Sequence, residues 1–306
     1  MMISKINIYK ASSLSSLSVM GEDAAAFLNS QFSADLRQPH PGLCAYGLWL
    51  DAKGKVQADS WVLCRDAETY EILSLGTEAA ILKEKLEKHI IADDVVIELM
   101  NGLSLLMLQG EGAEKFVDEL LGEVPEKEGF IETEETLCFL GRSSRGANYN
   151  FFYRDNLAAN AAFGQLEAAG AEAIDWGQIE LSRIAAGIPA IPQELGVSDL
   201  PGEAGLVGVE VCTTKGCFLG QESILRMHNL GRARRGLYAV SGEGSTPSIP
   251  SPLVVAGDKR QPGELRSAYV TASGWVGVAM LKLDRLEADI ECEGQRIKVG
   301  HAMGSS

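Results

Sequence analysis

The feature that most constrains the fold of this chain is a short repeat, found twice in its first half. Residues 21–28 and 110–117 share four identical positions out of eight, with Gly-Glu at the start and Phe at the seventh position. A strand-like apolar run precedes each copy, and the small and apolar residues inside each copy recur at helical spacing. The repeat therefore predicts that a strand, a glycine turn and a helix form twice.

The segments around the two copies alternate between strand-like and helix-like patterns. A strand-like run at residues 46–50 leads into a turn at 51–55. Amphipathic runs predict helices at residues 79–89, 157–169 and 176–188. The long strand–helix–strand rhythm of a parallel sheet is missing, so we expect an α+β fold. Three strand-like runs beyond residue 252 predict a small antiparallel β-barrel.

Length and composition are those of a folded protein without a membrane segment. The chain has 306 residues, 46% of them hydrophobic, which is enough for two or three packed units. No apolar run reaches the roughly 18 residues that a membrane span requires. The first ten residues lack the long apolar core of a secretory signal. We therefore expect a cytoplasmic location.

Charge is distributed unevenly along the chain. The net charge of −15 argues against broad binding of nucleic acid through the phosphate backbone. Residues 215–235 depart from this trend, with five cations and one acid. A locally positive stretch in an acidic protein favours a site for an anionic ligand, and a solvated basic face is the alternative interpretation.

Cysteine and histidine are too scattered to predict a metal site. None of the six cysteines has the Cys-x-x-Cys spacing of a zinc or dithiol site, and the four histidines do not cluster. We therefore expect no metal, and mostly reduced cysteines.

The most specific motif is the octapeptide Lys-Gly-Cys-Phe-Leu-Gly-Gln-Glu at residues 215–222. A helix-like run follows Cys217 closely, so the positive end of a helix and the charge of Lys215 would both favour its thiolate. Gly216 and Gly220 would let a ligand or a partner approach the backbone closely. The motif predicts a reactive thiol at the start of a helix, and a buried cysteine in that position is the alternative.

The octapeptide resembles the signature of the YgfZ-type folate-binding proteins. These are relatives of the glycine-cleavage T-protein, an aminomethyltransferase, and of mitochondrial iron–sulfur assembly factors. Further blocks similar to the family occur in the family's order at residues 21–28, 33–35, 51–55, 183–189, 201–206 and 263–267. The resemblance covers nearly the whole chain. It implies duplicated ferredoxin-like units of the aminomethyltransferase type in residues 1–236, a β-barrel in residues 237–306, and a central folate channel.

The resemblance also implies a function. It implies tetrahydrofolate or another folate as the cofactor, and support of iron–sulfur cluster assembly or repair and thereby of tRNA modification. Iron–sulfur proteins or assembly factors are the implied partners, and Cys217 is the residue on which the role depends. The residues implied at the cofactor are Trp176, which would stack on the pterin, and Asp35, Lys215, Gly216, Gly220, Gln221, Glu222 and Arg232.

Two other hypotheses remain beside this one. The first is a folate-dependent one-carbon transferase that uses Asp59. Aminomethyltransferases carry a pair of Asp residues after their Gly-Gly turn, whereas residues 54–59 at the matching place of this chain contain one carboxylate, Asp59. The missing partner argues against glycine cleavage. The second is a non-catalytic adaptor that docks a partner through Arg232, Arg234 and Arg235.

Overall fold

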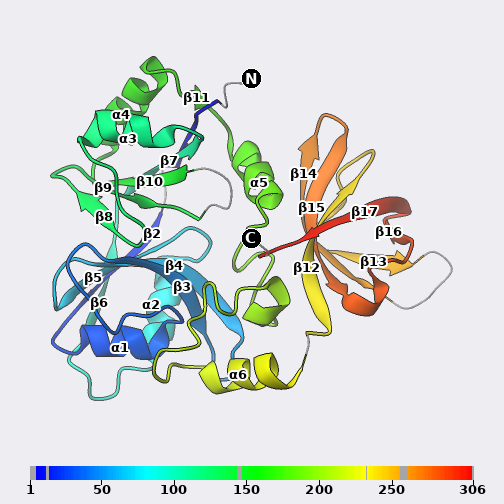
Figure 1. The fold of residues 1–306 in the computed structure, drawn as a ribbon, viewed down its shortest axis with the longest axis horizontal. Helices are drawn as coiled ribbons and strands as arrows, with labels where there is room; N and C mark the ends of the chain where they lie inside the picture. The colour runs from blue at the N-terminus through cyan, green and yellow to red at the C-terminus, as the bar shows by residue number, and fades with distance from the viewer. Residues whose placement is uncertain (1–4, 12–13, 143–146, 232, 256–260, 305–306) are drawn as a thin grey trace. The chain divides into compact units, whose positions relative to one another are not determined.

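The computed structural model describes residues 5–11, 14–142, 147–231, 233–255 and 261–304 (Figure 1). The chain forms two compact units. Unit 1 comprises residues 1–49, 58–175 and 214–219, and unit 2 comprises residues 50–57, 176–213 and 220–306. In the part of the chain that is described, no helix is long and apolar enough to cross a membrane.

The first sheet of unit 1 has six strands in the order β11-β1-β7-β10-β9-β8. Its strands are β1 (Asn7–Ala11), β7 (Ser104–Gly110), β8 (Phe130–Glu132), β9 (Thr136–Leu140), β10 (Ala147–Tyr153) and β11 (Glu172–Ala173). β1 and β11 are parallel, and the other neighbours are antiparallel. Helices α3 (Ala113–Leu121) and α4 (Asn156–Ala168) cover one face of this sheet through a core that includes Leu106, Val117 and Phe151.

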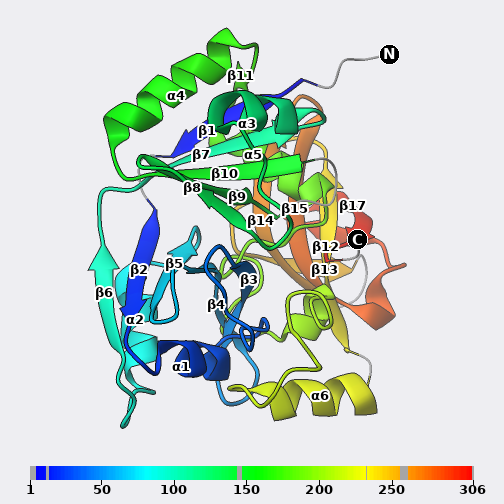
Figure 2. The ribbon, with the colours of Figure 1, turned by 60° about the vertical axis from the view of Figure 1, so that its left-hand side comes forward.

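The second sheet has five strands in the order β3-β4-β5-β2-β6. Its strands are β2 (Ser15–Met20), β3 (Cys44–Leu50), β4 (Val56–Cys64), β5 (Thr69–Ser74) and β6 (Val96–Met100). Helices α1 (Ala24–Gln31) and α2 (Ala79–Glu87) cover one face of it through a core that includes Leu28, Val62 and Leu82. Figure 2 shows α3 and α4 at the top, the first sheet beneath them and α1 at the bottom.

The two copies of the sequence repeat form the two strand–turn–helix junctions β2–α1 and β7–α3, as predicted. Gly21 and Gly110 open the two turns with nearly equal φ angles of +135° and +137°. A Cβ atom at Gly21 would lie 1.9 Å from the carbonyl oxygen of Asp94, and one at Gly110 would lie 2.8 Å from that of Lys5. Both turns therefore require glycine, for conformation and for space. The predicted α+β class is confirmed.

The faces of the two sheets that carry no helix meet through a row of aromatic rings. Tyr46 and Trp61 of the second sheet have ring centroids 5.0 Å apart, and Trp61 lies 5.6 Å from Phe139 of the first sheet. Phe139 then stacks on Phe152 at 5.1 Å. Such tilted and offset pairs stabilise a fold beyond the area that they bury. Because these faces pack against each other, polar side chains on them lie between the two sheets.

Unit 2 contains helices α5 (Trp176–Ala185) and α6 (Gln221–Leu230), the short helix η1 (Pro201–Ala204) and a closed barrel in the order β12-β15-β14-β13-β16-β17. The barrel strands are β12 (Arg235–Gly242), β13 (Ser251–Val255), β14 (Gly263–Thr271), β15 (Gly274–Lys282), β16 (Ile290–Cys292) and β17 (Gln295–Ala302), with η2 (Leu283–Arg285) after β15. Neighbouring strands pair antiparallel throughout the described barrel. The predicted barrel is confirmed, and the division after residue 236 stays a prediction.

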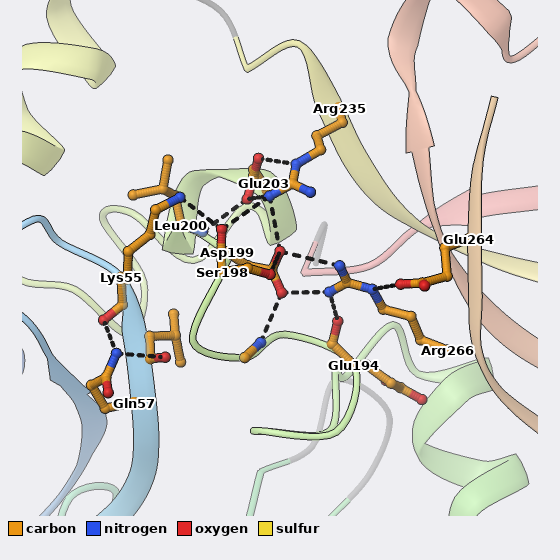
Figure 3. A network of polar contacts seen from close by, with 12 residues as sticks. Lys55, Gln57, Glu194, Ser198, Asp199, Leu200, Glu203, Arg235, Glu264 and Arg266 are labelled. Carbon is orange, nitrogen blue, oxygen red and sulfur yellow. Dashed lines mark hydrogen bonds and ion pairs between the residues drawn. The ribbon is translucent and has the colours of Figure 1, made fainter. Parts of the chain in front are cut away.

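A buried carboxylate, Asp199, joins three segments of unit 2 (Figure 3). Its side chain, 1% exposed, accepts hydrogen bonds from Arg235 of β12 at 2.9 Å and from Arg266 of β14. Its backbone carbonyl accepts from the N–H of Val56 at 3.0 Å, where β4 begins. Arg235 also donates to Glu203 at 2.6 Å. The network therefore ties the barrel to the segment before η1 and to the start of β4.

A second buried cluster ties α5 to the barrel. Arg183 donates to Glu180 on its own helix and to Glu194 at 2.7 Å and 2.9 Å. Glu194, which is fully buried, also accepts from the hydroxyl of Ser267 in β14 and from the N–H of Ala190 at 2.8 Å. Each buried charge thus has several partners, which is the condition under which buried ion pairs are tolerated.

Replacing Asp199→Asn tests the first network through its pH dependence. Burial opposes ionisation of Asp199, but the hydrogen bond from Arg266, the Gly196 N–H and the nearby arginine charges outweigh it and hold the pKa of Asp199 below its ordinary value. The stability from this carboxylate is therefore complete above the unfolded pKa of about 4 and is lost as the pH falls through the lower, folded pKa.

We expect Asp199→Asn to lower the free energy of unfolding by about 3–5 kcal/mol at pH 7, because two arginines lose their buried partner. The difference from wild type should narrow below about pH 4. Urea unfolding at pH 7 and pH 3 measures both. The control is Asp289→Asn, which breaks an exposed ion pair with Arg296 and should change stability by less than about 1 kcal/mol. A difference that is independent of pH would contradict the assignment.

Candidate functional site

The octapeptide is anchored to helix α1 by its lysine. The Lys215 side chain is buried, and its Nζ donates to the carbonyl oxygens of Asn29 at 2.8 Å, Phe32 at 2.6 Å and Ala34 at 2.7 Å. Asn29 and Phe32 lie in the last turn and at the C-cap of α1, where a cation is favourable, and Ala34 follows two residues later. The Leu219 N–H adds a bond to the Ser30 carbonyl at 2.9 Å. Both ends of the segment 215–219 are therefore held on α1, and contact of Lys215 with a cofactor stays a prediction.

Cys217 lies between these two anchors, and it is exposed. The alternative of a buried cysteine is therefore wrong. The predicted helix follows as α6, which begins at Gln221 with Glu222 in its first turn. A Cβ atom at Gly216 would meet nothing within 4 Å, whereas one at Gly220 would lie 2.5 Å from the carbonyl oxygen of Asp51. At Gly220 the close approach is thus made by the chain's own backbone.

The remaining residues implied at the cofactor fall in different places. Asp35 pairs with Arg37 at 2.6 Å, and this hydrogen bond lowers the pKa of Asp35, with a smaller contribution from the charge of Lys215. The structure therefore brings Asp35 and Lys215 together near the end of α1. Trp176 belongs to unit 2, where it is the first residue of α5 and 43% exposed. Arg232 lies outside the described residues.

The arginines proposed to dock a partner in the adaptor hypothesis differ in their surroundings. Arg235 is engaged with Asp199 and Glu203 inside unit 2, while Arg234 is exposed. Reversing the charge of Arg235 would therefore break the barrel network as well as any docking surface. Among the described residues, no group of three or more His, Cys, Asp or Glu side chains could hold a metal ion.

A polar cluster between the two sheets of unit 1 was largely missed by sequence reasoning. We define the polar cluster as Tyr46, Asp59, Arg142, Asn148 and Asn150. The Tyr46 hydroxyl donates to Asp59 Oδ2 at 2.5 Å, whereas the buried Asp59 Oδ1 has no partner among the described residues. Burial raises the pKa of Asp59, although the charge of Arg142 and the hydrogen bond from Tyr46 act in the opposite direction.

The amide members of the polar cluster lie deeper than the others. Asn148 and Asn150 are 7% and 1% exposed, whereas Tyr46, Asp59 and Arg142 are only partly buried. The guanidinium of Arg142 lies 4.7 Å from the ring centre of Tyr46, and its backbone carbonyl accepts from Asn148 Nδ2 at 3.0 Å. Within the described part of the chain, Asn148 Oδ1 and both amide atoms of Asn150 have no hydrogen-bond partner.

Unpaired polar atoms of this kind are rare in folded proteins, because each costs about 1–3 kcal/mol. Several of them at one place make the polar cluster a candidate binding site for a group with hydrogen-bonding atoms. The signal in the sequence is the pair Asn148-x-Asn150 at the start of an otherwise aromatic strand. Alternation along a strand puts both amides on one face, opposite Tyr149 and Phe151.

Lys215→Met tests the anchor of the octapeptide. Methionine fills a similar volume but donates no hydrogen bond, so three carbonyls at the end of α1 lose their donor. We expect the free energy of unfolding to fall by about 2–3 kcal/mol and the Leu219 amide to exchange faster. Hydrogen exchange and urea unfolding measure these effects. Lys53→Met, at an exposed turn, is the control. Unchanged exchange at Leu219 would show that Lys215 does not hold the segment.

Two protein-family models and several known proteins are similar to this chain. Residues 1–137 match the GCVT N-terminal domain family, and residues 234–302 match the CAF17 C-terminal beta-barrel domain family. The tRNA-modifying protein YgfZ of Edwardsiella ictaluri is 27% identical over 283 residues, covering 89% of this chain and 83% of the relative. That of Colwellia psychrerythraea is 21% identical over 271 residues, covering 87% and 82%.

A solved structure agrees with the domain matches. The glycine cleavage system aminomethyltransferase T from Bartonella henselae superposes with a TM-score of 0.80 at 15% identity, covering 97% of this chain and 85% of that one. At this identity the likeness concerns the fold. The resemblance expected from the octapeptide is confirmed: the chain matches a GCVT N-terminal domain and a CAF17-type C-terminal β-barrel, and its relatives include proteins named tRNA-modifying protein YgfZ.

Proposed function

We propose that this protein binds tetrahydrofolate or another folate and acts in support of tRNA modification. The observation that carries the proposal is the polar cluster of unit 1, in which Asp59 Oδ1 and the Asn150 amide have no hydrogen-bond partner among the described residues. The match to the GCVT domain supports folate binding, and the name of the YgfZ relatives, tRNA-modifying protein, supports a role in tRNA modification.

The residues of the polar cluster fit a folate. A pterin ring is flat and neutral and carries several hydrogen-bond donors and acceptors, so it would be held by amide groups and a carboxyl rather than by a cluster of charges. Asn148, Asn150 and Asp59 would bind and orient the ring, and Tyr46 would keep the Asp59 carboxyl in place. A bound folate would supply the capacity to carry a one-carbon group. The partly exposed side of the cluster, at Tyr46, Asp59 and Arg142, would give access to it.

The second part of the proposal concerns Cys217. An exposed thiol held on α1 at both sides suits an encounter with a macromolecule. We assign it as the redox or transfer thiol in the assembly or repair of iron–sulfur clusters, with iron–sulfur proteins or assembly factors as partners and a cytoplasmic location.

Calorimetric titration with tetrahydrofolate tests the ligand. We expect binding to the wild-type protein and a Kd about tenfold higher or more for Asp59→Asn, because the amide cannot reproduce the hydrogen bonds of the carboxyl. Asp118→Asn, on the exposed side of α3, is the control and should bind like wild type. No binding by the wild-type protein would refute the proposal. Transfer of a one-carbon group from an aminomethyl donor in the same mixture would favour the transferase alternative.

Cys217→Ala tests the thiol in cells that lack the native protein. We expect lower activity of iron–sulfur enzymes and less of the tRNA modification that depends on them, at nearly unchanged stability because the side chain is exposed. Cys212→Ala, a half-buried thiol five positions away, is the control and should restore activity. Full activity with Cys217→Ala would remove this residue from the mechanism.

A further inference from the structure

Strand β6 forms an open edge of the second sheet of unit 1. It pairs with β2 in an unbroken register along all five of its residues, and in the described chain no strand lies on its other side (Figure 2). Other edges of this unit are shorter or covered. β8 and β11 have three and two residues, and beside β3 the Ser33 N–H donates to the carbonyl of Leu48 at 2.9 Å. β6 is therefore a longer and more regular edge than these.

The backbone groups that β6 directs outward follow from the pattern of its neighbours. The Gly21 N–H donates to the Glu68 carbonyl at 3.0 Å, so Gly21 and every second residue before it in β2 bond to β5. The residues between them in β2 bond to the even-numbered residues of β6. The N–H and C=O groups of Ile97 and Leu99 consequently point away from the sheet, where a further strand could pair with them.

β6 lacks the features that usually protect an edge strand from pairing. Lysine, proline and bulges serve this purpose in many proteins, but the sequence Val-Ile-Glu-Leu-Met of β6 contains neither residue and its register does not shift. Val96 and Leu99, on opposite faces of the strand, are 51% and 47% exposed, and Ile81 on the neighbouring helix α2 is exposed as well. An added strand would therefore gain backbone hydrogen bonds and cover apolar surface on both faces.

The charge around β6 favours one kind of added strand. Residues 78–100 contain six acids and three lysines, and two of these lysines are paired with acids of the same segment. Before β6, the Asp94 N–H donates to the carboxylate of Asp23 at 2.8 Å, which adds a further acid. Exposed Glu98 lies on the same face as Val96, where it would attract a cation on an adjacent strand. A second copy of this chain, with a net charge of −15, would be repelled.

We propose that β6 binds an extended, basic segment of a partner protein, which joins the second sheet as its sixth strand. The segment would bond to the outward N–H and C=O groups of Ile97 and Leu99. It would place apolar side chains beside Val96 and Leu99, and a lysine or arginine across from Glu98. Binding of such a segment is independent of the proposed folate site, because β6 contains none of the residues of the polar cluster.

The probe for this surface is a capped ten-residue peptide that alternates valine and threonine, with lysine at two of the threonine positions. We expect it to slow hydrogen exchange at the Ile97 and Leu99 amides by about tenfold or more, because both N–H groups gain carbonyl partners. NMR-detected exchange on the full chain measures this protection. Fluorescence anisotropy with the labelled peptide gives the Kd.

Leu99→Pro tests the backbone contact. Proline removes the outward N–H of residue 99 and none of the bonds to β2, so the fold is retained, and we expect the Kd of the lysine peptide to rise about tenfold or more. Leu99→Thr keeps the N–H and is the matched control, with a Kd within about threefold of wild type.

Glu98→Lys tests the same surface through its charge, and this exposed side chain can be changed without touching the core. We expect the preference to reverse, so that a peptide with glutamate in place of lysine binds more tightly than the lysine peptide. Equal binding of the two peptides by wild type and by Glu98→Lys would show that charge does not select the strand, and would overturn the basic partner.

Three further results would overturn this inference. They are no binding of the lysine peptide, binding without protection of the Ile97 and Leu99 amides, and equal affinity of Leu99→Pro and Leu99→Thr. A dimer of the wild-type chain that dissociates in Leu99→Pro, seen by analytical ultracentrifugation, would assign the edge to a second copy instead. None of these results bears on folate binding, which the titration with tetrahydrofolate tests separately.

Discussion

The packing of the two sheets of unit 1 against each other is the constraint on which the candidate site depends. Helices cover one face of each sheet, so the remaining faces must bury each other, and they do so through Trp61 and Phe139. The same faces carry Asp59 and the two asparagines. Burial raises the pKa of Asp59, and among the described residues Asp59 Oδ1, Asn148 Oδ1 and both amide atoms of Asn150 have no hydrogen-bond partner. A looser interface would hydrate these groups and remove the energetic gain from binding a ligand there.

The lysine of the octapeptide has a different physical role from the one that its place before Cys217 suggests. A lysine two positions before a cysteine suggests a cation that activates the thiol. The Nζ of Lys215 instead donates hydrogen bonds to the carbonyls of Asn29, Phe32 and Ala34 at the end of α1. The cation stabilises a helix terminus and fixes the backbone on which Cys217 is displayed. Unit 1 thus contains both a group of buried polar atoms without a partner among the described residues and an exposed thiol. In the proposed function the first would meet a small molecule and the second a macromolecule.

Local pattern was enough to predict most elements. The predicted glycine turns at Gly21 and Gly110 are the junctions β2–α1 and β7–α3. The three predicted barrel strands are β13, β15 and β17, and the three predicted helices are α2, α4 and α5. Strands β14 and β16 of the barrel were not predicted. The predicted helix at 176–188 ends earlier, at Ala185, because Gly187 adopts a φ of +73°. The contacts of the site were beyond this reasoning: Lys215 lies 186 residues from Asn29 in the sequence, and Trp61 meets Phe139 only through sheet packing. Such pairings depend on tertiary structure and leave no periodic signal.

The composition of the polar cluster also restricts the chemistry that it can support. Asp59 is the one carboxylate of the polar cluster. Its neighbour Ala58 points to the opposite face of β4 and lies in the core with α1 and α2. One buried carboxyl with a raised pKa can exchange a proton with a bound ring, but it has no second carboxylate to share that work. Neutral amides complete the set, and they orient a ring without polarising it strongly. Under the proposed function, the arrangement would suit binding of the folate ring more than rapid acid–base turnover, and the proposed thiol, Cys217, lies outside the polar cluster.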